Sequence, residues 1–163
     1  MISTLTGGEL WMSKAVGKHR NDSAKAKGRK GAHGNRDDEA MALHRHIVGA
    51  CAECAVAKLI NRFWFQPDFR NRRDGDVGYG LHVRATDRQD GRLIVHDTDP
   101  DDGMFILAIQ DIYIPARFDV VGFLYGADAK DQKWWWEDTP RPAFFVPREA
   151  LVPIETLLNL EPV

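Results

Sequence analysis

The fold is decided by two segments, Glu53-Cys-Ala-Val-Ala-Lys58 and, after a loop, Asp76-Val-Gly-Tyr-Gly-Leu-His82-Val-Arg84. The first has a carboxylate among small and apolar residues, which is typical of a buried helix. The second is typical of a loop that leads into a short strand. Because alternate residues of a strand share a face, we expect His82 and Arg84 to emerge on the same side. Together the two segments predict a polar site between a helix and a sheet.

Two helices are predicted before this site. Thr6 is a candidate N-cap with Glu9 as its capping-box partner, and a short amphipathic helix follows as far as Val16. Residues 21–36 combine many positive charges with glycines, which predicts a mobile basic loop. A second helix is predicted from Asp37 to about Arg62, apolar on most sides near residues 47–60.

The rest of the chain predicts short strands. We expect strands at 81–86, 92–96, 105–110, 118–125 and 143–146. Asp90-Gly91 favours a hairpin between the first two, and Gly122 favours a bulge or a close approach of another segment. A short helix is expected over 127–135 and a turn or helix after Pro147. The prediction is a single α+β domain over 1–163, with a helical part at 1–62 packed on a mainly antiparallel or mixed sheet at 76–163.

Composition limits the classes of function. The 163 residues carry a net charge of −2, but residues 1–73 hold +7 and residues 74–163 hold −9. The basic half predicts contact with a polyanion, attraction between the two parts of the chain, or a solvated segment. No apolar run approaches the roughly 20 residues of a membrane helix, and the N-terminus lacks the layout of a secretion signal. We therefore expect a cytoplasmic protein without a membrane partner.

Three patterns favour packing over chemistry. Cys51 and Cys54, with His44 and His46 upstream, fall on one helix and do not converge as zinc ligands must, so we expect buried thiols and no zinc. Residues 97–103 lack the ligand spacing of a calcium loop and predict a solvated acidic turn. Residues 134–136 are three tryptophans that cannot all face one core. They predict packing on the helices or on a second subunit of a homodimer, with base stacking as the alternative.

The polar site has the composition of a magnesium site. Cleavage of a phosphodiester with Mg²⁺ or Mn²⁺ needs carboxylates to hold the ion and a cationic group to neutralise developing charge. Glu53 and Asp76 are the candidate ligands, His82 a ligand or water-orienting group, and Arg84 the charge stabiliser. The alternatives are pairing of Glu53 with an arginine, and polar residues of the sheet surface without chemistry. Candidate phosphate contacts are Lys18, Arg20, Arg72 and Arg73.

The same residues resemble the PD-(D/E)xK nuclease superfamily, in which an Asp, an (Asp/Glu)-x-Lys strand and a helical Glu make the site. A second resemblance, to a group of proteins from bacteriophages of actinobacteria, spans most of the chain. It rests on the segments Glu9-Leu-Trp, Glu53-x-Ala-Val-Ala-Lys58, Asp76-Val-Gly-x-Gly-Leu-x-Val-Arg84, Gly91-Arg-Leu-Ile-Val-His, Asp99-Pro-Asp-Asp, Val121-Gly-Phe and Arg141-Pro-Ala-Phe-Phe-Val-Pro147. The resemblances imply a restriction-endonuclease-like core and a DNA-associated phage protein that hydrolyses phosphodiesters with Mg²⁺ or Mn²⁺.

The sequence departs from the superfamily pattern in one strand. His82 stands in the acid position, where the phage group has Glu-Val-Arg, and Arg84 stands in the lysine position. Neutral histidine ligates metals but lacks the negative charge that magnesium prefers, and arginine does not serve readily as a base. Two expectations follow: a nuclease with an altered site, or a non-catalytic protein with a nuclease-like fold that binds a host or phage protein.

Overall fold

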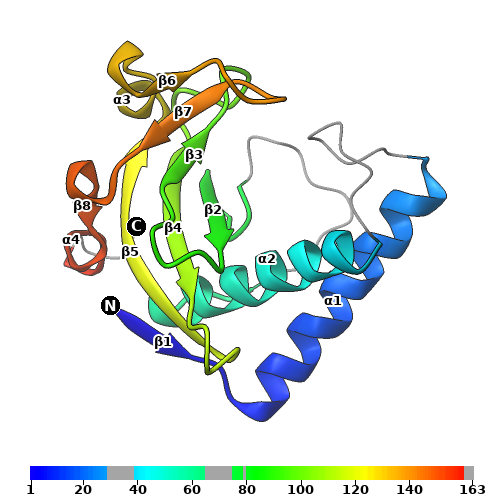
Figure 1. Cartoon of the computed structure of the whole chain (residues 1–163). Coiled ribbons are helices and arrows are strands. Elements are labelled where there is room, and N and C mark those ends of the chain that lie inside the picture. The colour runs from blue at the N-terminus through cyan, green and yellow to red at the C-terminus, as the bar shows by residue number, and fades with distance from the viewer. Residues whose placement is uncertain (29–38, 65–74, 79, 160–163) are drawn as a thin grey trace.

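The computed structural model of the chain describes residues 1–28, 39–64, 75–78 and 80–159. Helix α2 (Glu39–Leu59) covers one face of a five-stranded sheet, with helix α1 (Gly7–Ala26) packed against α2, and a three-stranded sheet covers the other face (Figure 1). The predicted α+β class, with N-terminal helices on a mixed sheet, is confirmed. No helix in these ranges is long and apolar enough to cross a membrane.

The larger sheet has the strand order β1-β5-β4-β2, with β8 pairing beside β5, and the smaller has the order β3-β7-β6. Their bounds are β1 Ile2–Thr4, β2 Leu81–Thr86, β3 Leu93–Val95, β4 Met104–Gln110, β5 Arg117–Tyr125, β6 Trp135–Trp136, β7 Ala143–Val146 and β8 Val152–Pro153. The short helices are α3 (Gly126–Ala129), α4 (Ile154–Leu158) and the 3₁₀ turns η1 (Gln132–Trp134) and η2 (Arg148–Ala150). Among these named strands, only the pairing of β2 with β4 is parallel.

The predicted hairpin between the strands at 81–86 and 92–96 is wrong. β2 pairs with β4, and β3 pairs with β7 in the other sheet. The local turn does form, since the Gly91 amide donates to the Arg88 carbonyl at 3.0 Å. Leu93 and Val95 are nevertheless fully buried in the core between the two sheets, and that burial directs β3 away from β2.

Several boundaries also differ from the sequence prediction. The Thr6–Glu9 capping box is confirmed, but α1 continues to Ala26, so the basic loop predicted over 21–36 begins later, and residues 29–38 lie outside the described part. The N-terminal part is not purely helical, because Ile2–Thr4 form β1. The helix predicted over 127–135 is divided into α3 and η1, and Trp135 already belongs to β6.

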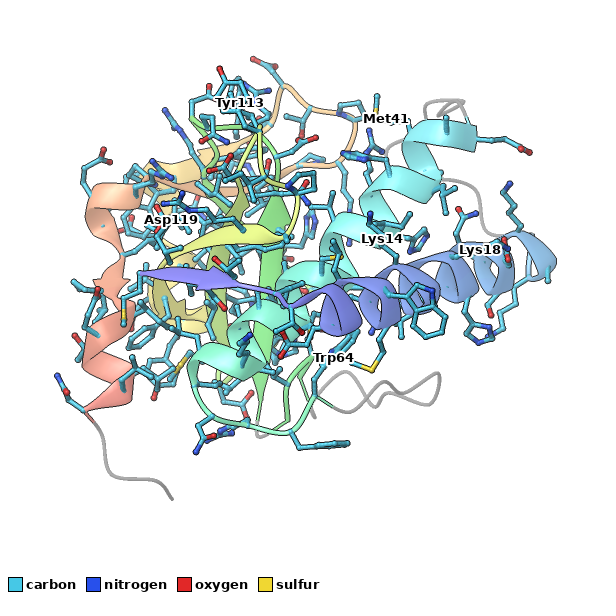
Figure 2. All side chains as sticks on the ribbon, turned by 90° about the horizontal axis from the view of Figure 1, so that it is seen from below. Lys14, Lys18, Met41, Trp64, Tyr113 and Asp119 are labelled. Carbon is cyan, nitrogen blue, oxygen red and sulfur yellow. The ribbon has the colours of Figure 1, made fainter. Side chains whose placement is uncertain are left out.

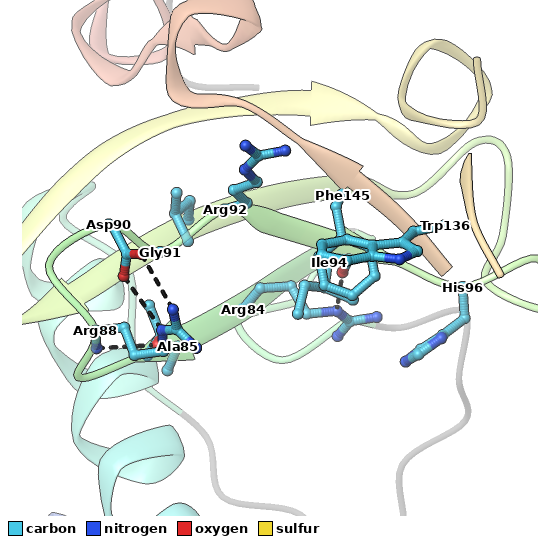
Figure 3. Close-up of a pocket in the computed structure, with 12 residues that line it drawn as sticks. Arg84, Ala85, Arg88, Asp90, Gly91, Arg92, Ile94, His96, Trp136 and Phe145 are labelled. Atoms are coloured by element: carbon cyan, nitrogen blue, oxygen red, sulfur yellow. Dashed lines mark hydrogen bonds and ion pairs between the residues drawn. The ribbon is translucent and has the colours of Figure 1, made fainter. Parts of the chain in front are cut away.

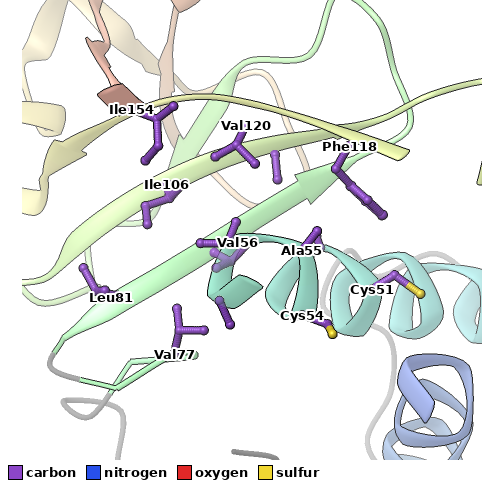
Figure 4. Close-up of a cluster of buried hydrophobic side chains, with 14 of the residues drawn as sticks. Cys51, Cys54, Ala55, Val56, Val77, Leu81, Ile106, Phe118, Val120 and Ile154 are labelled. Atoms are coloured by element: carbon purple, nitrogen blue, oxygen red, sulfur yellow. The ribbon is translucent and has the colours of Figure 1, made fainter. Parts of the chain in front are cut away.

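Two cores lie on the two faces of the larger sheet. On one face, residues of α2 from Ala50 to Ala57 are all buried and pack against Leu81, Val83 and Ile106 (Figure 4). Cys51 and Cys54 are buried free thiols in this core. The other face packs against the smaller sheet, and its core contains Leu93, Val95, Phe105, Leu107, Ile109 and Val146.

Gly122 of β5 lies at a close approach, as its sequence context predicts. The register of β4 and β5 shifts between Leu107 and Ala108, whose partners are Gly122 and Val120, so β5 has a bulge there. A Cβ atom at Gly122 would also collide with the carbonyl oxygen of Val152 in β8. The small residue therefore allows β8 to pair with β5.

Gly17 sets the distance between the two long helices. A Cβ atom there would lie 2.6 Å from the Cα of Ile47 and 2.8 Å from the carbonyl oxygen of His46, both in the backbone of α2. Backbone atoms cannot move aside as a side chain can, so any larger residue must push α1 away from α2. This close crossing lies one turn before Arg20, which bonds to α2.

We predict that Gly17→Ala lowers the free energy of unfolding by about 1–3 kcal/mol, measured by urea unfolding. Alanine is a better helix former than glycine by about 1 kcal/mol. A lower free energy of unfolding in spite of that gain would therefore show that the Cβ atom collides with α2. Gly49→Ala in α2 is the matched control, because nothing lies within 4 Å of its Cβ position, and it should stabilise the protein. Equal effects of the two substitutions would contradict the close crossing.

Candidate functional site

Glu53 lies on α2, 6% exposed, and is held by two other segments. Arg20 of α1 donates from Nη1 to Oε1 at 2.7 Å and from Nη2 to Oε2 at 2.8 Å, and Trp64 Nε1 donates to Oε2 at 3.2 Å. This is a bidentate pair between a buried carboxylate and a mostly buried guanidinium. Arg20, expected to contact phosphates, therefore directs its guanidinium at Glu53, and the pairing of Glu53 with an arginine that the sequence left as an alternative is present.

The carboxyl group of Glu53 has an unusual proton affinity. Burial, and after it the negative charge of Asp76, raise its pKa to about 7 from an ordinary value of 4.5. Arg20 and Trp64 act in the opposite direction and do not outweigh them. A buried carboxyl group whose pKa is raised by a neighbouring carboxylate is found in catalytic and metal sites, and also in structural networks.

Asp76 lies at the edge of β2 that is not paired with β4. The chain reaches it through Gly75, which has a φ of +71° and forms a parallel bridge with Leu81. The Asp76 amide donates to the Leu81 carbonyl at 2.6 Å, and its Oδ2 accepts from the Val83 amide at 2.7 Å. These bonds fix the carboxylate against the strand edge. Its charge there acts on both Glu53 and His82.

His82 is 8% exposed and faces the smaller sheet. Its ring stacks on Phe105 with centroids 4.7 Å apart and an interplanar angle of 13°. Burial lowers the pKa of its imidazole, and Arg84 adds to this, while Asp76 acts against it. The ring is therefore neutral at pH 7. Its Nε2 atom is buried and makes no hydrogen bond to any described residue, which is unusual for a buried polar atom.

Arg84 follows on the same face of β2 and is fixed by the turn between β3 and β4. It donates from Nη2 to Asp99 Oδ2 at 2.7 Å and from Nε to the Ile94 carbonyl at 3.1 Å, and its guanidinium carbon lies 4.9 Å from the centroid of the Phe105 ring. Burial acts to raise the pKa of Asp99, but Arg84 and the His96 amide outweigh it and lower that pKa. The prediction of a wholly solvated acidic turn at 97–103 is therefore wrong for Asp99.

The four predicted site residues do not meet at one point. Leu81 and Val83 of β2 belong to the core under α2, so His82 and Arg84 lie on the opposite face from Glu53. Asp76, at the strand edge, interacts electrostatically with a residue on either side. Within the described ranges, no three His, Cys, Asp or Glu side chains are placed to hold one metal ion.

Of the residues predicted to contact phosphates, only Lys18 and Arg20 lie in the described part of the chain. Lys18 is exposed on the half of α1 that lies away from the sheet and pairs with Asp22 at 2.6 Å (Figure 2). Such an exposed pair contributes little to stability, so Lys18 is free to exchange partners. Arg72 and Arg73 lie outside the described residues.

Sequence reasoning missed a group of residues beside Arg84. They line a pocket of about 540 Å³ between β2, the turn after it and the smaller sheet, and include Arg88, Arg92, His96 and Trp136. A signal was present, because basic residues recur at every fourth position through 84, 88, 92 and 96. These residues do not lie on one face of a single strand, because the chain turns between β2 and β3. They come together in the pocket because of that turn.

Comparisons of the chain with known protein families, with curated proteins and with solved structures found no match. The fold and the site define an α+β protein in which a buried helical carboxylate, Glu53, lies near the half-buried Asp76 at the edge of a mixed sheet.

Proposed function

We propose that this is a DNA-associated phage protein of the host cytoplasm, with a restriction-endonuclease-like core, which cleaves phosphodiester bonds with Mg²⁺ or Mn²⁺. The observation that carries the proposal is the burial of Glu53 near the negative charge of Asp76, which together raise the pKa of Glu53 to about 7. A buried carboxylate that is repelled by a second, half-buried one is a place where a divalent cation gains binding energy. The substrate would be superhelical or branched DNA.

The donor atoms fit a cation in part. Glu53 and Asp76 would hold it through carboxylate oxygens, which Mg²⁺ and Mn²⁺ prefer. When bound, the ion would polarise the phosphate and lower the pKa of a water molecule. Both oxygens of Glu53 already accept hydrogen bonds from Arg20, so the ion must share this carboxylate with a guanidinium.

The other residues of the site have roles that their contacts suggest. The Nε2 atom of neutral His82, buried and without a hydrogen bond to a described residue, can accept a proton from water or orient it. Arg84, on the face of β2 opposite Glu53 and paired with Asp99, would contact only the part of the DNA that reaches the pocket on its own face. Arg20 keeps the Glu53 carboxylate in place and compensates part of its charge.

The test is cleavage of supercoiled plasmid and branched DNA in the presence of Mg²⁺ or Mn²⁺, with EDTA as the metal-free condition. We predict that Asp76→Asn and Glu53→Gln each reduce the rate at least about 100-fold, which corresponds to roughly 3 kcal/mol of activation free energy. Asp138→Asn is the control, since Asp138 is an exposed acid outside the site. Cleavage that persists in Asp76→Asn, or in EDTA, would contradict the proposal.

The bidentate Arg20–Glu53 pair favours a second function, a non-catalytic protein that binds a host or phage protein through the tryptophan segment and the acidic part of the chain. Glu53 is then structural, and folded wild-type protein cuts no DNA with either metal. Binding to a protein partner that changes little with salt, without affinity for DNA, would support this second function. A steep salt dependence of DNA binding would support the first.

A further inference from the structure

The pocket beside Arg84 combines positive charge with aromatic rings (Figure 3). Its walls come from the second half of β2, the turn at 87–92, β3, β6 and β7. The lining residues are Arg84, Ala85, Thr86, Arg88, Asp90, Gly91, Arg92, Ile94, His96, Leu107, Trp136 and Phe145. A volume of about 540 Å³ is in the range of pockets that hold small ligands.

The charges in this pocket are available to a ligand. Arg92 is exposed and makes no hydrogen bond or ion pair to a residue in the described ranges, although it lies near enough to Asp90 to affect its carboxyl group. Arg88 bonds to Asp90, but both side chains are about three-quarters exposed, so the pair costs little to separate. Arg84, in contrast, is fixed by Asp99 and forms an immobile wall.

The aromatic side of the pocket has a half-exposed ring, that of Trp136. Trp136 is 49% exposed and meets Phe145 edge to face, with ring centroids 5.3 Å apart. Its neighbours are turned into the protein: Trp134 packs on the core between the sheets, and Trp135 contacts Phe144. Figure 3 shows Trp136 and Phe145 at the end of the pocket where Ile94 and His96 also lie, with Arg88 and Asp90 toward the other end. A flat apolar surface therefore lines the same pocket as the arginines.

We propose that this pocket binds a nucleotide unit of single-stranded nucleic acid, with the base on Trp136 and the phosphate on Arg88 and Arg92. An indole face stacks on any base, and exposed arginines bind phosphate. A paired duplex cannot offer the face of a base, because its bases stack on each other. The inference rests on the proposed association with DNA but not on cleavage. The pocket would be the surface through which the protein contacts DNA, and it begins at Arg84, two residues after His82 on β2.

The first experiment measures the anisotropy of a labelled 15-residue oligothymidylate in EDTA, where metal-dependent cleavage is blocked. We expect Trp136→Ala to weaken binding about tenfold, through loss of one stacked base. Trp136→Leu, which keeps apolar bulk without a ring, should behave in the same way and guards against unfolding of the alanine variant. Trp11→Ala is the matched control, since Trp11 is 75% exposed on α1, and it should bind like wild type.

Two further measurements separate stacking from charge. An abasic strand of the same length should bind wild type about tenfold more weakly, and Trp136→Ala should weaken that strand no further. Arg92→Ala should lower the slope of log affinity against log salt by about 0.7, the value for one phosphate of a single strand. Lys14→Ala, which removes an exposed positive charge from α1, should leave that slope as in wild type.

Unchanged binding by Trp136→Ala and Trp136→Leu, or no binding of the oligonucleotide at all, would overturn the inference. Duplex DNA bound as tightly as the single strand would also overturn it, in favour of plain phosphate contact. If thymidine monophosphate bound as tightly as the oligonucleotide, the ligand of this pocket would be a free nucleotide and not single-stranded nucleic acid, and the inference would be overturned. Binding and cleavage are tested independently. If the protein binds single-stranded DNA through Trp136 but does not cut DNA, the binding inference holds and the nuclease proposal is wrong.

Discussion

Replacement of Arg20 by alanine is expected to lower the free energy of unfolding by about 3 kcal/mol or more at pH 8. The substitution leaves Glu53, 6% exposed, with Trp64 but without the guanidinium that bonds to both of its oxygens. Removal of one partner of a buried ion pair typically costs about 3–5 kcal/mol, because the remaining charge is buried without compensation. Urea unfolding followed by tryptophan fluorescence measures the loss.

The pH dependence of this loss tests its cause. The folded-state pKa of Glu53 is raised to about 7 from 4.5, so its protonated form favours the folded protein, and this contribution disappears as the pH rises through about 7. Arg20 lowers that pKa, so its removal raises it further. The penalty of Arg20→Ala should therefore be smaller at pH 5 than at pH 8.

Two companion variants separate charge from packing. In the Arg20→Ala background, Glu53→Gln removes the buried negative charge and should recover stability at pH 8 while changing little at pH 5. Arg20→Lys should remain destabilised, since an ammonium cannot form the two parallel bonds of a guanidinium. A loss below about 1 kcal/mol at pH 8, or one independent of pH, would contradict the buried pair.

Phe105→Ala is expected to have an effect of similar size, about 3–5 kcal/mol, for a different reason. The ring is fully buried on β4 in the core between the two sheets. It also stacks on His82 and lies below the guanidinium of Arg84. Alanine leaves a cavity there that the surrounding sheets cannot fill. Urea unfolding measures the loss, with Phe63→Ala as control, because Phe63 is 85% exposed and should change stability by less than about 0.5 kcal/mol.

Phe105→Leu distinguishes the packing role from the role in the site. Leucine fills most of the volume, so the protein should stay folded, but the stack on His82 is lost. Burial is the main cause of the low pKa of His82, so looser packing should raise that pKa toward 6.5, measured by NMR titration of the imidazole. An unchanged pKa in this folded variant would show that Phe105 does not shield His82.

The sequence was most informative where structure depends on neighbours in the chain. The Thr6–Glu9 capping box, the burial of α2 around Glu53 and the limits of β2 and β7 agree with prediction. Each follows from residues within one or two turns of helix or one strand, because caps and hydrophobic periodicity are local signals. The α+β class follows from the order of these elements.

The sequence identified the polar residues of the candidate site but could not determine which of them meet. Glu53 and Asp76 influence each other, yet His82 and Arg84 lie on the far side of β2. Alternation along a strand shows that two residues share a face, but not which face a helix covers. The partner of Arg84, Asp99, belongs to a turn that local reasoning treated as solvated.

By itself, therefore, the sequence determined the presence of the two long helices, the positions of β2, β3, β4, β5 and β7, the α+β class and the polar residues that could take part in chemistry. Only the tertiary structure decided that β3 leaves β2 for β7, that Arg20 bonds to Glu53 33 residues away, and that basic residues gather with Trp136 in one pocket. The reason is physical. Strand pairing and buried ion pairs are selected by burial over the whole domain, and their free energy depends on segments far apart in the chain.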